Sequence, residues 1–136
     1  MKKIGILLIA IFALSCNLGS DDTSNIRQEL LPIDVAVVPD EFVLNHTYVI
    51  DLAYIRPTTC HAFKDIYYMA EDNQRTIAIV ANVFNSSSGC DEIATVVETS
   101  FNFIATQTGT YVFKFWKGLD ENGEDQYSIY EIPVIE

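Results

Sequence analysis

Residues 108–117 read T-G-T-Y-V-F-K-F-W-K, and this stretch decides the fold. Tyr111, Phe113 and Phe115 occupy every second position, which is the period of a β-strand with one strongly apolar face. The acidic run at residues 120–125 follows directly and suits a hairpin loop. We expect this strand to lie at the centre of a small β-sandwich.

Six further stretches show strand-like patterns, and none shows a helical period. They are residues 33–38, 47–55, 61–69, 76–84, 95–105 and 126–135. With the central stretch they give about seven short strands joined by short turns, which is typical of an immunoglobulin-like sandwich. The sequence therefore predicts an all-β fold, one immunoglobulin-like β-sandwich of about seven antiparallel strands over residues 33–136.

A local motif supports this fold. Gln107-Thr108-Gly109-Thr110-Tyr111 resembles the corner before the sixth strand of immunoglobulin-like domains, where the tyrosine hydroxyl bonds back to the backbone. Phe113 stands where antibody domains have a cysteine, so any disulfide must lie elsewhere.

The N-terminus has the features of an export signal. Lys2 and Lys3 precede an apolar run that extends to Leu14 and is too short to span a bilayer. Residues 1–15 are therefore predicted to be a signal peptide and are excluded from the fold.

The apolar run ends at Ser15-Cys16, which resembles the lipobox of bacterial lipoproteins, whose cysteine carries the lipid. The polar, acidic residues 17–24 resemble the tethers of Bacteroidota-type lipoproteins, where such acidity is associated with display on the cell surface. The resemblance implies lipidation of Cys16 and a flexible tether over residues 16–32. The alternative is ordinary cleavage, with no role for Cys16.

The composition is strongly acidic. Because residues 1–15 hold two lysines and no acidic residue, the rest of the chain has 6 basic and 19 acidic residues, a formal charge of −13. Such a field repels phosphate backbones, so nucleic acid is excluded as a partner, and only the lipid should hold the protein to a membrane. A metal cation, a basic protein or a neutral sugar stays compatible, and acidity can also serve solubility alone.

Cys60 and Cys90 form an even pair once Cys16 is assigned to the lipid. Because disulfides persist in exported chains, we predict a Cys60–Cys90 bridge, which would stabilise the fold by about 3–4 kcal/mol. One alternative is a metal site that includes His61, although adjacent Cys-His is poor spacing for two ligands of one ion. The other is a reactive thiol, although no basic residue lies close to either cysteine.

If each strand reverses the chain, alternate loops fall at the same end of the sandwich. The loops at residues 56–61, 85–94 and 118–125 then share one end, which places the two cysteines together as a disulfide requires. Such loops often bind partners. The candidate residues for binding a protein or a glycan are Arg56, Pro57, Thr58, Thr59, Asp91, Glu92, Trp116, Asp120, Glu121, Asn122, Glu124 and Asp125. The alternative is that these loops are solvated tips.

No arrangement of residues predicts catalysis. The acidic run 120–125 could offer oxygen ligands to calcium, but it lacks the EF-hand spacing and its Asn-Gly pair is equally what a turn requires. His61 is the one base expected near Cys60 or Ser88, and nothing completes a triad. We therefore expect no enzyme activity, no cofactor and no metal.

Residues 56–63 read R-P-T-T-C-H-A-F and resemble the N-P-T-T-G loop of chagasin-type cysteine-protease inhibitors, which are immunoglobulin-like. In that family this loop and two others at the same end enter the protease cleft. The match covers Pro57, Thr58 and Thr59, because the family's flanking asparagine and glycine are replaced here. The resemblance implies protease inhibition as an alternative function.

Taken together, these features predict a monomeric, lipid-anchored protein of the cell envelope, on its periplasmic or its surface face. The single sandwich would act as a binding or structural accessory module. Cysteine-protease inhibition is the alternative from another functional class.

Overall fold

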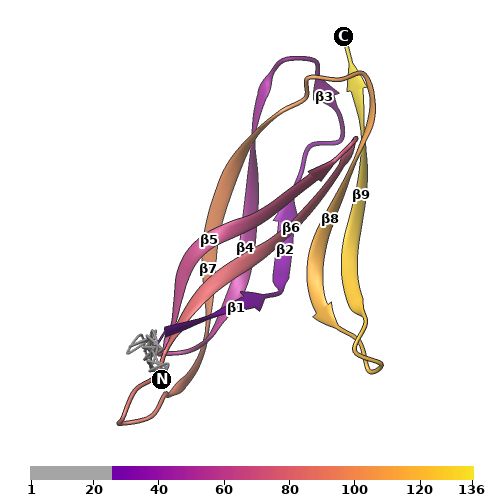
Figure 1. Ribbon diagram of the computed structural model, residues 1–136. Helices are drawn as coiled ribbons and strands as arrows, with labels where there is room; N and C mark the ends of the chain where they lie inside the picture. The colour runs from indigo at the N-terminus through magenta and orange to yellow at the C-terminus, as the bar shows by residue number, and fades with distance from the viewer. Residues whose placement is uncertain (1–25) are drawn as a thin grey trace, which may run out of the picture.

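The structure, a computed structural model, describes residues 26–136, and these residues contain nine strands and no helix (Figure 1). The strands are β1 (Ile26–Leu31), β2 (Ile33–Val37), β3 (Phe42–Val43), β4 (Thr47–Thr58), β5 (His61–Glu71), β6 (Gln74–Phe84), β7 (Glu92–Ile104), β8 (Gly109–Leu119) and β9 (Asp125–Ile135). The all-β prediction is confirmed, with nine strands instead of about seven. Within residues 26–136 no helix is long and apolar enough to cross a membrane.

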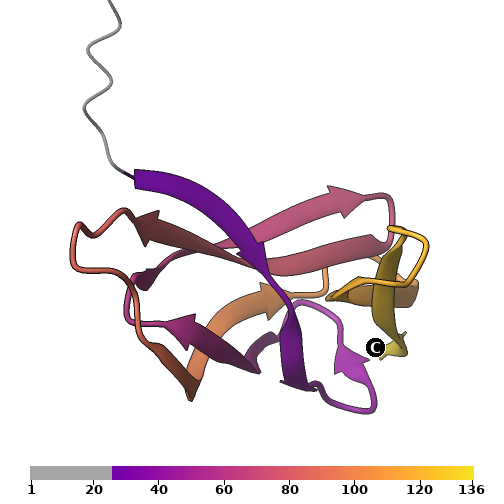
Figure 2. The same ribbon diagram turned by 90° about the horizontal axis from the view of Figure 1, so that it is seen from below.

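The strands form two layers, as expected of a β-sandwich (Figures 1 and 2). Sheet A has the order β1-β6-β8-β9-β3, and β5 also pairs with β6. Sheet B has the order β2-β4-β7. The chain passes from sheet A to sheet B at Pro32, which stands between the buried residues Leu31 and Ile33.

Two strands were not predicted. β1 pairs with β6 from Ile26 opposite Phe84 to Leu31 opposite Ile79, so the predicted tether over residues 16–32 is too long at its C-terminal end. The rest of that tether, Cys16 and the predicted signal peptide lie outside the described residues. The two-residue strand β3 pairs with β9 and buries Phe42 completely.

The prediction of antiparallel pairing throughout is wrong at two places. β6 runs parallel to β8, with Gln74 opposite Val112, and β3 runs parallel to β9. The reason for the first is topological: β7 reverses the chain between β6 and β8 but lies in sheet B. The strands before and after β7 in the chain, β6 and β8, therefore pair in sheet A and run in the same direction.

β8 is the central strand that the sequence predicts. It lies between β6 and β9, and Tyr111, Phe113 and Phe115 are each 0% exposed. The hydroxyl of Tyr111 accepts hydrogen bonds from the backbone N–H groups of Thr106 at 3.3 Å and Gln107 at 3.2 Å. This confirms the predicted tyrosine corner.

Candidate functional site

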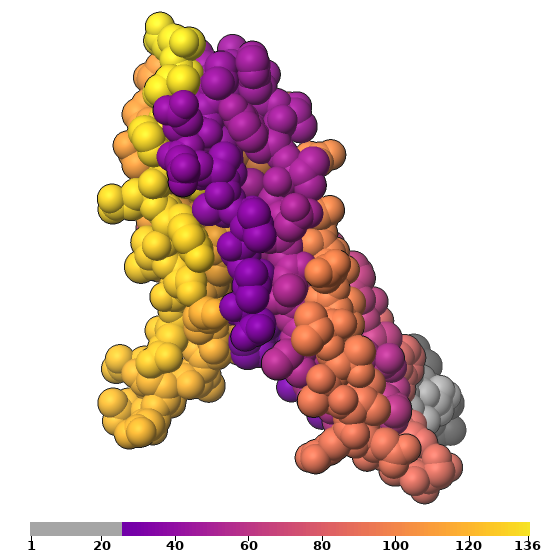
Figure 3. Space-filling view, turned by 180° about the vertical axis from the view of Figure 1, so that it is seen from behind, coloured from indigo at the N-terminus to yellow at the C-terminus, as the bar shows by residue number. Residues whose placement is uncertain are grey.

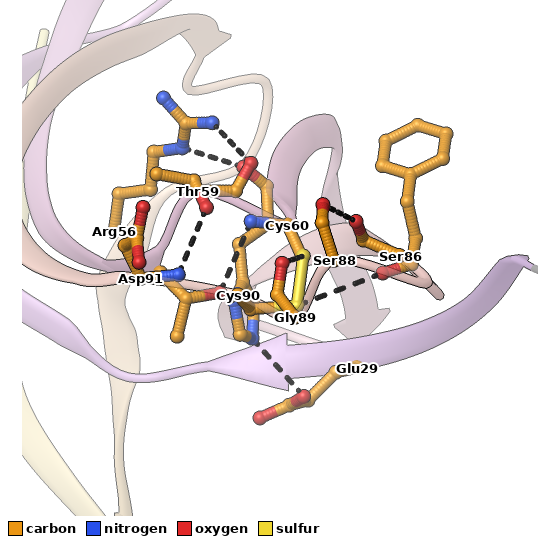
Figure 4. The surroundings of a disulfide bond; sticks show 12 residues. Glu29, Arg56, Thr59, Cys60, Ser86, Ser88, Gly89, Cys90 and Asp91 are labelled. Atoms are coloured by element: carbon orange, nitrogen blue, oxygen red, sulfur yellow. Dashed lines mark hydrogen bonds and ion pairs between the residues drawn. A yellow bond between two sulfur atoms is a disulfide. The ribbon is translucent and has the colours of Figure 1, made fainter.

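The disulfide joins the β4–β5 connection to the β6–β7 connection, both of which pass from one sheet to the other. Cys60 and Cys90 are bonded, with their Cα atoms 5.5 Å apart (Figure 4). The predicted pairing is confirmed, and both sulfurs are used in it. Neither cysteine of the pair is left as a thiolate for a metal or a nucleophile.

Several predicted binding residues hold this disulfide end together. Asp91 N–H donates to the hydroxyl of Thr59 at 3.1 Å, and Thr59 N–H donates to the Asp91 carbonyl at 2.9 Å. Arg56 donates to the carbonyls of Thr59 and His61 (Figure 4). Arg56, Thr59 and Asp91 therefore provide hydrogen-bond partners for the backbone where the chain crosses between the sheets.

His61 links this crossing to β1. Its ring is buried, with Nδ1 2.7 Å from the Thr58 hydroxyl and Nε2 3.2 Å from Oε2 of Glu29. The Thr58 hydroxyl also accepts from the N–H of Cys60 at 3.1 Å. Both ring nitrogens are thus engaged, and the arrangement is structural. Sequence reasoning missed Glu29 because it assigned that residue to the tether.

The acidic tip between β8 and β9 is a self-bonded turn. The Asp120 carboxylate accepts from the N–H groups of Asn122 at 2.8 Å and Glu124 at 2.9 Å. No group of three or more His, Cys, Asp or Glu side chains among residues 26–136 could hold a metal ion. The geometry therefore matches the interpretation of this run as a turn.

The candidate loops share one end of the molecule but do not form one surface. The tip at residues 120–124 and the loop at residues 85–91 lie on two separate prongs (Figures 1 and 3). A β-bulge between Trp116 and Gly118 precedes the tip, and Gly118 has a φ of 100°. The pairing of β6 with β8 already ends at Ile77 and Phe115, and beyond it the two strands lead to separate prongs. The single loop surface that the sequence predicts is therefore divided.

The remaining candidates fall on both prongs. Pro57 lies within β4, and Glu92 begins β7 opposite Thr58. Glu121 is exposed at the acidic tip. On both prongs, polar groups described above bond within the fold, among them those of Thr59, Asp91 and Asp120.

A different feature is an open groove on the outer face of sheet A, with a volume of about 450 Å³. We call it the sheet A groove. It is lined by Leu30, Tyr67, Met69, Glu71, Gln74, Thr76, Ala78, Lys114, Trp116, Asp125 and Tyr127. Only Trp116 and Asp125 belong to the predicted binding residues.

The floor of the groove is made by small residues of β6. Thr76 and Ala78 alternate with the core residues Ile77 and Ile79, so they point away from the core. Thr76 is nevertheless only 7% exposed and Ala78 only 2%. Side chains of the neighbouring strands therefore rise above them, which explains why both faces of this strand are apolar in the sequence.

One wall of the groove comes from β8 and β9. Trp116 lies opposite Tyr127 in the strand pairing, and its indole N–H donates to the Asp125 carboxylate at 3.0 Å. The Lys114 ammonium lies 4.3 Å from the centre of the Tyr127 ring, a cation–π contact. This wall is aromatic, and its cation is already paired with a ring.

The other wall comes from β5. Tyr67 and Met69 lie opposite Ala78 and Thr76 in the pairing and share their face of the sheet. Burial raises the pKa of Tyr127 above its ordinary value of 10.0, and the negative charges of Asp125 and ionised Tyr67 add to the shift. The Tyr127 hydroxyl therefore keeps its proton at neutral pH and can donate a hydrogen bond.

A second hollow, of about 700 Å³, lies between the edge strands β5 and β7. Its main polar group, Arg75, donates to the Tyr68 hydroxyl at 2.8 Å and to the Asp72 carbonyl at 2.8 Å. The guanidinium also lies 5.1 Å from the centre of the Tyr111 ring. The lining of this hollow is also aromatic, with Phe63, Phe101 and Phe103 beside Tyr68.

Comparison with protein-family models, curated proteins and solved structures finds no match for this chain. The assignment of a site therefore depends on geometry and chemistry. Both hollows combine concavity, aromatic side chains and polar groups, which are the usual marks of a ligand site. The sheet A groove is the one that includes two predicted binding residues, Trp116 and Asp125.

Proposed function

We propose that this chain is a lipid-anchored protein of the cell envelope that presents an immunoglobulin-like β-sandwich as a binding module. The observation that carries the proposal is the sheet A groove, where aromatic walls enclose a buried floor on the outer face of a sheet. Trp116, Tyr67 and Tyr127 gather around this hollow, and a concave surface lined by aromatic side chains is a common place for a ligand to bind.

The disulfide supports the predicted location. Cys60–Cys90 belongs in an oxidising compartment, which fits export across the inner membrane. Strand β1 begins at Ile26, opposite Phe84 and next to the loop of Cys90. Cys16 stands ten residues before Ile26 in the sequence, so a lipid on it would hold the disulfide end towards the membrane.

That attachment leaves the face of sheet A accessible. The groove lies on the side of the sandwich, whereas the predicted binding loops Arg56–Thr59 and Asp91–Glu92 lie at the tethered end. A membrane-proximal disulfide end suits a structural role for those loops, and a lateral groove suits a ligand in the surrounding medium.

The anchor is tested by fractionation. The wild-type protein should sediment with membranes and need detergent for extraction, whereas Cys16→Ser should appear in the soluble fraction. Recovery of Cys16→Ser in the membrane pellet, released by detergent alone, would contradict lipidation. Labelling with a radioactive fatty acid gives the same distinction chemically.

Protease inhibition stays a prediction of the sequence resemblance. The hydroxyls of Thr58 and Thr59 are bonded to His61, Cys60 and Asp91, so these residues act within the fold. We expect no inhibition of papain at micromolar protein. Inhibition that is lost in the Thr58→Ala, Thr59→Ala variant would favour the alternative.

A further inference from the structure

We propose that the sheet A groove binds a neutral oligosaccharide. This proposal depends on the proposed function, because it assigns a ligand class to the surface that carries that function. It differs from the loop end predicted from the sequence, since only Trp116 and Asp125 of the predicted residues line the groove.

The shape of the groove fits a sugar ring. A pyranose has two faces of C–H groups and a periphery of hydroxyls, so it needs apolar walls with polar groups around them. Tyr67 and Met69 on one side and Trp116 and Tyr127 on the other supply the walls, above the small floor residue Ala78. Aromatic faces carry partial negative charge, which favours contact with polarised C–H groups.

The polar groups of the groove match hydroxyls. Glu71 and Asp125 supply carboxylates that accept hydrogen bonds, and Gln74 supplies an amide that both donates and accepts. The hydroxyls of Tyr67 and Tyr127 stand at the ends of apolar rings. The Asp125 carboxylate already accepts from Trp116 and the Tyr67 hydroxyl already donates to Met69. A hydroxyl-rich ligand could therefore pair chiefly with Glu71, Gln74 and the Tyr127 hydroxyl.

The charge of the site favours a neutral ligand. Glu71 and Asp125 are acidic, and the ammonium of Lys114, the one basic residue among those that line the groove, lies over the Tyr127 ring. The whole chain has a formal charge of −11. Uronic acids, sulfated sugars and phosphates would therefore be repelled.

The backbone argues against an extended peptide. Peptides that pair with sheets need a free strand edge, but the floor strand β6 is bonded to β5 on one side and to β1 and β8 on the other. The groove therefore offers side chains and no row of free backbone groups. A sugar requires only side chains.

The experiment uses the single tryptophan of the chain, Trp116, as its own probe. The full-length lipoprotein is purified in lauryldimethylamine oxide, which has no sugar headgroup. Tryptophan fluorescence is then titrated to about 10 mM with hexaoses of glucose, xylose and mannose, with a polygalacturonate hexamer, and with a pool of unstructured peptides. We expect at least one neutral hexaose to shift the emission in a saturable manner.

Three variants locate the site. Tyr67→Ala should weaken the binding of that hexaose at least tenfold, and Tyr68→Ala is its control, because the next residue along β5 points to the other face. Ala78→Leu, which fills the floor and removes no aromatic ring, should weaken binding similarly. Thermal unfolding monitored by circular dichroism verifies that each variant is folded.

The outcomes separate the two proposals. If no neutral hexaose binds, or if binding survives both Tyr67→Ala and Ala78→Leu, the oligosaccharide proposal is overturned. If the acidic hexamer or the peptides bind in a way that Tyr67→Ala abolishes, the groove is a binding site and only the ligand class is wrong. If no ligand responds to any groove variant, the binding function itself fails.

Discussion

Tyr111 contributes both a buried ring and a bonded hydroxyl. Its two hydrogen bonds fix the backbone of residues 106–107 before β8 begins. We expect Tyr111→Phe to lower the free energy of unfolding by about 1–2 kcal/mol, since each such bond has a modest net value. Urea unfolding measures this, with the exposed Tyr130→Phe as the control. Equal losses in both variants would contradict a specific role for the corner.

Tyr54 should make stability depend on alkaline pH. Burial raises its pKa above the ordinary 10.0, and the charge of Arg56 opposes the shift in part. The folded state therefore resists ionisation, and the contribution of this residue is complete below pH 10 and lost as pH rises beyond it. Tyr54→Phe should lose less stability than wild type between pH 9 and 11. Identical urea midpoints against pH in the two proteins would refute this.

At the residue scale, the sequence predicts contacts that depend on a local motif or on the alternation of strand direction. Tyr111 was identifiable from its corner motif, and the Cys60–Cys90 pair from the even count and the alternation of strand direction. The pair of Glu29 and His61 was not, because it joins residues 32 positions apart through an unpredicted strand. Side-chain pairs of that kind depend on register, which sequence alone does not supply.

At the scale of elements, Gly118 shapes the β8–β9 hairpin. Its φ of 100° is unfavourable for other residues, and an added Cβ would lie 3.4 Å from Cγ of Pro32. We expect Gly118→Ala to cost about 1–3 kcal/mol of unfolding free energy. Gly123→Ala, with φ of 78° and open space around it, is the matched control and should cost less. A cost no greater at residue 118 would show that its backbone is no more demanding than that of the turn at Gly123.

The disulfide is the covalent link between two elements. Replacing both cysteines by alanine should lower the free energy of unfolding by about 3–4 kcal/mol, because the bridge closes a loop of about 30 residues in the unfolded chain. The difference between oxidised and reduced wild type in urea should be similar. A loss below about 1 kcal/mol would mean that hydrogen bonds such as Thr59–Asp91 suffice to hold this end.

Strand prediction succeeded where alternation was long. The central stretch at residues 108–117 became β8, and all six other predicted segments are strands. β1 was missed because Ile26–Leu31 follows a polar run and has apolar residues mainly at its end. β3 has only two residues, too few for any periodic pattern.

For the whole molecule, the alternation of strand direction predicts which loops share an end. It does not predict how far apart those loops lie. The two prongs in Figure 3 separate the acidic tip from the disulfide loops, because β6 and β8 are paired only as far as Ile77 and Phe115. The sheet A groove was equally unforeseen. It is built from residues of β1, β5, β6, β8 and β9, and its floor exists only because small side chains of β6 lie between aromatic neighbours.

The most direct test is nuclear magnetic resonance mapping with the neutral hexaose that binds. We expect the indole N–H signal of Trp116, the single tryptophan, to shift on titration together with the amide signals of residues 67–78 and 114–127. Shifts confined to residues 56–61 and 85–92 would contradict it, because they would return the ligand to the disulfide end.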